Sequence, residues 1–384
     1  MRLARAVPKL LFVAVVIGAG TASIASTPGC GTGFDPVSKI RGVRILATKA
    51  DKPFAHPGDT VNLEMLVADG RTEKTRPLTV SWIPAVCTNP RSDLYYACFA
   101  PQYATDGGAS DASLALTDGG ASVTDAGEGG DAGQTAQAPA ASSGAGALAS
   151  IIAKIPPHTN LTPFLPQGLT YSFKVPADIV SSHVPTPGAA RPYGLAILFN
   201  YACAGHLEIV PIDSSGNPLQ IPIGCFDDDG NQVKVDDGVF GLLRVYSHND
   251  ISNANPVIDS FTQDGVAVDL RAGITLDHCT ASRRGDCQKV KLTPVVPETS
   301  WEENPDSNDG RGNMQHEEVW VDYYSTIGDL GDDARLLYDV GAGKIQKPEV
   351  EFQPPSDPGE GTLWAVVHDN RGGVEWVVVP LHVK

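Results

Sequence analysis

The stretch "GTLWAVVHDNRGGVEWVVVPLHV" (residues 361–383) contains the firmest β-hairpin signal in the chain. Residues 363–368 and 374–379 are two runs rich in β-branched and aromatic residues, a composition that favours strands. The five residues between them, Asp-Asn-Arg-Gly-Gly, include types that tolerate the positive φ of tight hairpin turns. This stretch therefore predicts two adjacent antiparallel strands and sets the expectation of a β-rich fold.

Strand-like alternation recurs along the rest of the chain. Apolar and polar residues alternate over residues 61–67, 78–82, 171–175 and 319–323, and large apolar residues together with Cys203 occupy every second position of residues 195–203. Period two is typical of half-buried strands, and no segment of ten or more residues shows the 3.6-residue apolar period of a helix. We therefore predict an all-β protein with few helices, built from two immunoglobulin-like β-sandwich domains at residues 38–245 and 246–384.

An acidic insert interrupts the first predicted sandwich at residues 104–150. Its residues 106–150 contain no aromatic, cysteine or basic residue and consist mostly of Gly, Ala, Ser, Asp and Thr. Such a segment buries too little apolar area to offset the entropy lost on ordering. We therefore predict that the insert is disordered and acts as a solvated spacer.

The N-terminus has the layout of a secretory signal. Three basic residues in the first nine precede an unbroken apolar run at residues 10–17, which is too short for the ~20 residues of a membrane-spanning helix. Two processing routes are open. Cleavage after Ala25 would release a secreted chain, whereas a degenerate lipobox at residues 27–30 would end the signal at residue 29. In the second case Cys30 becomes the lipidated first residue, followed by a tether over residues 30–37.

The cysteine count favours the lipid route. The chain has seven cysteines, and the six beyond Cys30 fall into neighbouring pairs: Cys87 with Cys98, Cys203 with Cys225, and Cys279 with Cys287. In an oxidising compartment the six downstream cysteines would form three disulfides, and Cys30 would remain unpaired. The neighbour pairing is our preferred connectivity among several, and the alternative is that some of these cysteines are buried and reduced.

The organisation of the chain resembles that of the predicted lipoproteins of myxobacteria. The resemblance lies in the export signal, the cysteine near position 30, the opening "GVRILATKADKPFAHPGDTVNLEML" (42–66) and the ending "VVHDNRGGVEWVVVPLHV" (366–383). It covers most of residues 30–384 except the insert. It implies a β-sandwich fold and a lipid-anchored location in the bacterial cell envelope, facing the periplasm or the cell surface, and it implies no activity. A secreted location is the alternative.

Charge and motifs exclude several classes of function. The formal net charge is −17, which disfavours nucleic acid as a partner. The chain has no H-E-x-x-H, C-x-x-C or G-x-S-x-G motif and no P-loop. We therefore predict a protein that is not an enzyme. A hydrolase whose site is assembled from residues distant in sequence remains an alternative, because such sites are defined by geometry.

Calcium is the one ion that the sequence suggests. In "EENPDSNDGRGNMQHEE" (302–318), Asp306, Asn308 and Glu317 occupy places 1, 3 and 12 of a calcium loop. Other places of that loop hold unsuitable residues, so an ordinary polar loop is the alternative. Asp227, Asp229 and Asn231 pose the same choice between calcium ligands and a turn. No other cofactor is expected.

These observations predict an interaction or scaffold module of the cell envelope. Its expected partners are the membrane, through the lipid anchor, and an envelope protein or polysaccharide. A carbohydrate-binding module is a further alternative, which would need exposed aromatic faces such as those of Trp301, Trp320 or Trp364. The alternative interpretation is that these tryptophans lie in the hydrophobic core.

Overall fold

The computed structural model describes residues 36–99, 151–152, 154–184, 188–211 and 221–384. The regular structure in these ranges consists of strands, short 3-10 turns and the helical residues 151–152, and the dominance of strands confirms the all-β fold. The turns are Arg91–Asp93, Tyr95–Cys98, Thr162–Phe164, Val235–Asp237, Arg284–Asp286 and Glu298–Ser300. No helix in the described ranges is long and apolar enough to cross a membrane. The predicted signal, Cys30 and the insert at 104–150 lie outside the described residues.

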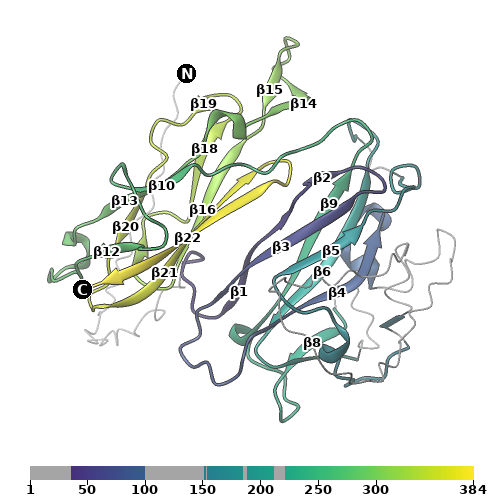
Figure 1. Ribbon diagram of the computed structural model, residues 1–384, viewed down its shortest axis with the longest axis horizontal. Coiled ribbons are helices and arrows are strands. Elements are labelled where there is room, and N and C mark those ends of the chain that lie inside the picture. Colours follow the sequence, from purple (N-terminus) through teal and green to yellow (C-terminus); the bar gives the residue numbers. More distant parts are fainter. Residues whose placement is uncertain (1–35, 100–150, 153, 185–187, 212–220) are drawn as a thin grey trace, which may run out of the picture. The chain divides into compact units, whose positions relative to one another are not determined.

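The strands before residue 250, here called the first half, form three sheets (Figure 1). The first sheet has the order β1-β3-β5, with β1 at Val43–Ala50, β3 at Thr60–Asp69 and β5 at Thr170–Lys174. The second has the order β2-β9-β6-β4, with β2 at Phe54–Ala55, β9 at Gly238–Ser247, β6 at Gly194–Cys203 and β4 at Thr79–Thr88. The third pairs β7 (His206–Ile209) with β8 (Ile223–Phe226).

The core of the first half follows from the alternation in β3. Val61, Leu63 and Met65 are buried on one face of the β1-β3-β5 sheet and belong to the same hydrophobic cluster as Trp82 and Leu198 of the β2-β9-β6-β4 sheet. The opposite face of the second sheet is buried in another cluster, which includes β7 and β8. Because β6 is covered on both faces, it is a nearly continuous apolar run rather than an alternating strand.

The strands after residue 255, here called the second half, form two larger sheets and one hairpin. The five-stranded sheet has the order β11-β10-β13-β20-β17: Val266–Ala267, Ser260–Gln263, Val290–Val295, Val350–Gln353 and Asp329–Leu330. The six-stranded sheet has the order β12-β22-β21-β16-β18-β19: Ile274–Leu276, Val374–Val383, Gly359–Asp369, Val319–Ser325, Ala334–Asp339 and Gly343–Lys344. β14 (Glu303–Asn308) pairs with β15 (Met314–His316).

The predicted C-terminal hairpin is confirmed. β21 and β22 pair antiparallel from Gly359 opposite Val383 to His368 opposite Val374. In the turn, Gly372 has a φ of 91°, a left-handed conformation that glycine adopts without strain. The inner faces of the two larger sheets share one cluster, which includes Phe352 and Val379.

A smaller cluster joins the two halves. Leu46 and Leu66, from β1 and β3, belong to the same hydrophobic cluster as Trp364 and Val374 of β21 and β22. Beside this cluster, the Lys49 Nζ lies 4.5 Å from the centre of the Trp376 ring. The outer face of the β1-β3-β5 sheet is therefore partly covered by the C-terminal hairpin.

The three expected disulfides are present between sequence neighbours. Cys87 is bonded to Cys98, Cys203 to Cys225 and Cys279 to Cys287. Cys203 is almost fully buried, so it points inward from its strand. The preferred connectivity from the sequence is therefore confirmed.

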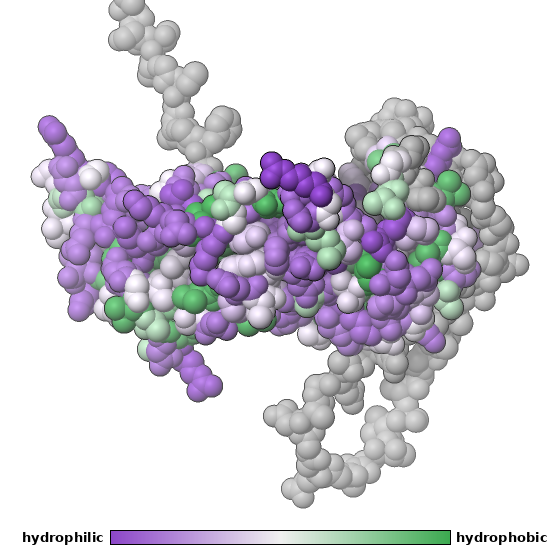
Figure 2. Space-filling model, turned by 90° about the horizontal axis from the view of Figure 1, so that it is seen from above, coloured by the Kyte–Doolittle hydropathy of each residue, from purple (hydrophilic) through white to green (hydrophobic). Residues whose placement is uncertain are grey.

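The surface has a mixed character. Figure 2 shows one face, on which hydrophobic residues are scattered among hydrophilic ones. Exposed apolar side chains such as Phe164 and Val235 belong to different elements. Scattered apolar residues are normal on protein surfaces and mark no particular site. A binding site is therefore expected in one of the concave regions of the surface.

Candidate functional site

A cleft of about 480 Å³ lies beside the ends of β2 and β9. We call it the aromatic cleft and define it by four aromatic or imidazole side chains, three arginines and Asn370: Phe54, Tyr193, Tyr246, His248, Arg191, Arg244, Arg371 and Asn370. Its volume lies in the range of small-molecule sites, which is about 300–1,000 Å³. It is therefore our candidate functional site.

Strand pairing positions the aromatic wall. β2 runs parallel to β9 and places Phe54 opposite Tyr246. The centre of the Phe54 ring lies 4.8 Å from that of His248 and 6.5 Å from that of Tyr246. Tyr193, next to the start of β6, continues the wall at 5.7 Å from Tyr246. The rings thus come from within or directly beside β2, β9 and β6, which only the folded sheet brings together.

A partly buried hydrogen-bond network fixes Tyr193. Its hydroxyl donates to the Asp93 carboxylate, whose other oxygen lies 2.9 Å from the His183 Nε2. The His183 Nδ1 lies 2.8 Å from the Tyr193 carbonyl oxygen. Both ends of Tyr193 are therefore held, and its ring is a rigid part of the cleft.

Burial keeps the aromatic wall neutral. It lowers the pKa of His248 from its ordinary value of 6.5, so the imidazole is uncharged at pH 7. It also raises the pKa of Tyr246 from its ordinary value of 10.0, although the nearby Arg244 opposes this. The charge in the cleft therefore comes from its arginines and Asp306.

Arg191 binds one of the residues that the sequence suggested as a calcium ligand. Its guanidinium donates to both carboxylate oxygens of Asp306 at 2.6–2.9 Å, and to Asp250 at 2.7 Å. Asn308 uses its side-chain oxygen to accept the Gly310 N–H at 3.0 Å. Glu317 accepts the Glu302 N–H at 2.9 Å. Asp306, Asn308 and Glu317 thus each have a different partner.

The described residues hold no group of three or more His, Cys, Asp or Glu side chains placed to bind a metal ion. At the second calcium candidate, Asp227 accepts the backbone N–H groups of Asp229 and Asn231 at 3.1 and 2.8 Å. This is the bonding of an Asx turn. Calcium binding at either place stays a prediction.

Arg371 connects the cleft to a buried carboxylate pair. Its Nη1 lies 3.5 Å from the Glu317 carboxylate and its Nη2 donates to the Ser252 carbonyl oxygen at 2.7 Å. Glu317 is fully buried, and this burial together with the nearby Asp369 raises its pKa to about 7. Burial also raises the pKa of Asp369, which accepts an N–H from Asn253 at 3.1 Å. The pair anchors the β21–β22 turn to the segment that connects the two halves.

None of the three tryptophans proposed from the sequence lines the aromatic cleft. Trp301 and Trp364 are each 7% exposed and belong to hydrophobic clusters, as the alternative interpretation of core tryptophans predicted. Trp320 is half-buried and stacks on His368 at 5.2 Å. Phe54, Tyr193 and Tyr246 lie outside the segments in which alternation predicted strands, and no motif links them.

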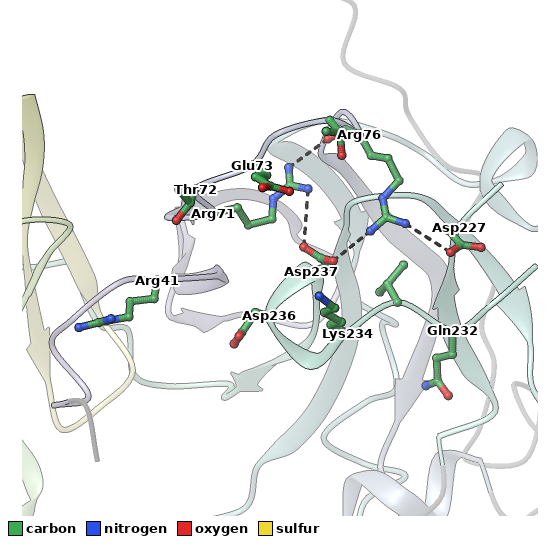
Figure 3. A pocket seen from close by; sticks show the side chains of 12 residues that line it. Arg41, Arg71, Thr72, Glu73, Arg76, Asp227, Gln232, Lys234, Asp236 and Asp237 are labelled. Atoms are coloured by element: carbon green, nitrogen blue, oxygen red, sulfur yellow. Dashed lines mark hydrogen bonds and ion pairs between the residues drawn. The ribbon is translucent and has the colours of Figure 1, made fainter. Parts of the chain in front are cut away.

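A second, polar cleft of about 470 Å³ lies between the β3–β4 connection and the segment before β9. Figure 3 shows Arg71 and Arg76 directed toward Asp237. Arg76 donates to Asp237 at 3.0 Å, while Arg71 makes a two-pronged pair with Asp69 at 2.9 Å. Since these charges neutralise one another, we assign this network a structural role.

The chain matches no protein-family model, and no curated protein matches it. Among solved structures, it matches the crystal structure of dimeric latent PorU from Porphyromonas gingivalis, with 10% sequence identity and a TM-score of 0.18. The match covers 90% of this chain and 24% of the PorU chain. A similarity this weak carries no argument about fold or function.

Proposed function

We propose that this chain is a lipid-anchored protein of the bacterial cell envelope, in which two immunoglobulin-like β-sandwich domains form a non-catalytic interaction or scaffold module. One observation carries the proposal. Six of the seven cysteines are paired with one another, so Cys30, at the end of an export signal, has no disulfide partner within the chain. Lipidation gives this cysteine a role, and residues 30–37 then tether the module.

The chemistry of the chain supports this location. Disulfides persist in oxidising compartments such as the periplasm and the cell surface. One acyl chain holds a protein at a membrane only reversibly, whereas two or more chains anchor it stably, and a lipidated N-terminal cysteine can supply them. The bound partner is then an envelope protein or polysaccharide near the membrane.

The test is the replacement Cys30→Ser in the full chain. We expect the wild-type protein in the membrane fraction and the variant in the soluble periplasm or the medium. Ser26→Ala is the matched control, because it alters the same region but leaves the cysteine, and it should remain in the membrane fraction. A Cys30→Ser protein that stays membrane-bound, or an unlipidated mature chain starting near residue 26 by intact mass, would contradict the proposal.

The aromatic cleft favours a second role, the binding of a saccharide. Aromatic side chains offer apolar faces for the C–H groups of sugar rings, and polar groups at the rim orient the hydroxyls. The half-buried Phe54 and Tyr246 supply such faces in a cleft of about 480 Å³, beside the buried Tyr193. This role is compatible with a lipid anchor, because a tethered module can bind envelope polysaccharide.

A further inference from the structure

The three arginines of the aromatic cleft differ in how their charge is balanced. Arg191 is paired with Asp306 and Asp250, and Arg371 lies 3.5–3.6 Å from Glu317 and Glu302. Arg244 makes no hydrogen bond or ion pair with any residue that the structure describes, and its side chain is exposed. Arg244 is therefore the uncompensated positive charge of the cleft.

Two further polar groups of the cleft also lack partners among the described residues. They are the Tyr246 hydroxyl and the Asn370 side-chain amide, whereas the Asn370 backbone N–H is bonded to the Glu318 carbonyl oxygen. Arg244 and Tyr246 are two residues apart in β9 and thus share one face of the sheet. A cation, a hydroxyl and an amide are therefore available beside an aromatic wall.

This set of groups fits a sugar ring that carries one carboxylate. The aromatic wall can pack against the C–H face of the ring, and the hydroxyl and amide can bond to its hydroxyls. A guanidinium binds a carboxylate through two parallel N–H···O bonds. The formal net charge of −17 opposes multiply charged anions such as phosphates more than it opposes a single carboxylate.

We propose that the aromatic cleft binds an acidic saccharide, with Arg244 holding the carboxylate of a hexuronate and with Tyr246 and Asn370 bonding to its hydroxyls. The inference rests on the saccharide-binding role proposed above and does not depend on lipidation. The compensated Arg191 and Arg371 shape the walls of the cleft and remain bound to their carboxylates.

The experiment compares two disaccharides that differ in one group. Cellobiouronic acid carries a carboxylate where cellobiose carries a CH₂OH group. Binding of each to the disulfide-bonded protein is measured by isothermal titration calorimetry at low and high salt. We expect the acidic disaccharide to bind about tenfold more tightly at low salt, because a charge-assisted hydrogen bond is worth at least that factor. High salt should reduce the difference.

Variants locate the site. Arg244→Ala should lose the preference for the acidic disaccharide but still bind both weakly, and Tyr246→Phe should weaken both alike. Arg283→Ala, which removes an exposed arginine outside the cleft, is the matched control and should leave binding unchanged. Circular dichroism checks the fold of each variant.

The outcomes separate the two proposals. Equal binding of both disaccharides to the wild type, or an unchanged preference in Arg244→Ala, overturns the acidic-saccharide inference and leaves the saccharide role standing. Failure of both disaccharides to bind the wild type at millimolar concentration overturns both. A preference that disappears in Arg244→Ala and survives in Arg283→Ala supports the inference.

Discussion

Replacing Glu317 by Gln should remove a large part of the pH dependence of stability. Glu317 is fully buried, and burial together with Asp369 raises its pKa from an ordinary value of 4.5 to about 7. Because the folded-state pKa lies above the unfolded-state value, the neutral carboxyl stabilises the fold fully below pH 4.5. This contribution is lost as the pH rises through about 7.

The magnitude follows from the two pKa values. The difference between 4.5 and about 7 corresponds to about 3 kcal/mol of unfolding free energy. About 2 kcal/mol or slightly more of this falls between about pH 5 and about pH 8. Glutamine has nearly the same shape and can still accept the Glu302 N–H, but it carries no proton to lose. Arg371 keeps its bond to the Ser252 carbonyl oxygen in this variant.

The assay is urea unfolding of the disulfide-bonded protein at about pH 5 and about pH 8, followed by tryptophan fluorescence. The wild type should lose about 2 kcal/mol more than Glu317→Gln over this interval. Asp369, whose pKa is also raised by burial, contributes with the same sign and remains in the variant, so its profile should be flatter but not level. Glu303→Gln, which alters an exposed carboxylate of the β14–β15 hairpin, is the control and should follow the wild type. Parallel profiles for the wild type and Glu317→Gln would refute the reasoning.

Two further predictions concern stability. Arg71→Ala should lower the free energy of unfolding by about 2–3 kcal/mol, because it leaves Asp69 without its two-pronged partner in a mostly buried place. The ammonium of Lys74 lies 4.0 Å from Asp69 and is largely exposed, so Lys74→Ala should lower the free energy of unfolding by less than about 0.5 kcal/mol. Thermal unfolding that ranks the two variants equally would contradict this view of the network. The double variant Cys203→Ala/Cys225→Ala should lose about 3 kcal/mol, because the disulfide closes a loop across 22 residues in the unfolded chain. Its urea midpoint should lie between those of the oxidised and the fully reduced wild type, because reduction also breaks the other two disulfides. An unchanged midpoint relative to the oxidised wild type would show that the bond does not constrain the unfolded state.

Local patterns in the sequence predicted the strands and the disulfides well. Residues 61–67 lie in β3, residues 195–203 in β6, and the C-terminal runs in β21 and β22. These predictions succeed because alternation and turn chemistry act over a few residues. The neighbour pairing of the cysteines succeeds for a similar reason, since each pair lies within 22 residues along the chain.

The calcium hypothesis shows how a local pattern leaves the surroundings of a residue open. Glu317 was considered as a ligand in a polar loop, but it is fully buried beside Asp369 and Arg371. Its burial depends on the β21–β22 turn, more than 50 residues further along the chain. Spacing within the 302–318 stretch carries no information about that distant turn.

The sequence alone thus determined the all-β class and the C-terminal hairpin and favoured the correct pairing of the cysteines, because each depends on residues close together in the chain. Only the tertiary structure decided the candidate site. Phe54 and Tyr246 lie on β2 and β9, and Tyr193 lies next to the start of β6; the order of these strands in the sheet is β2-β9-β6, which period-two alternation does not specify. The free guanidinium of Arg244 was equally hidden, because the partners of an arginine are set by long-range pairing of strands and loops rather than by its neighbours in sequence.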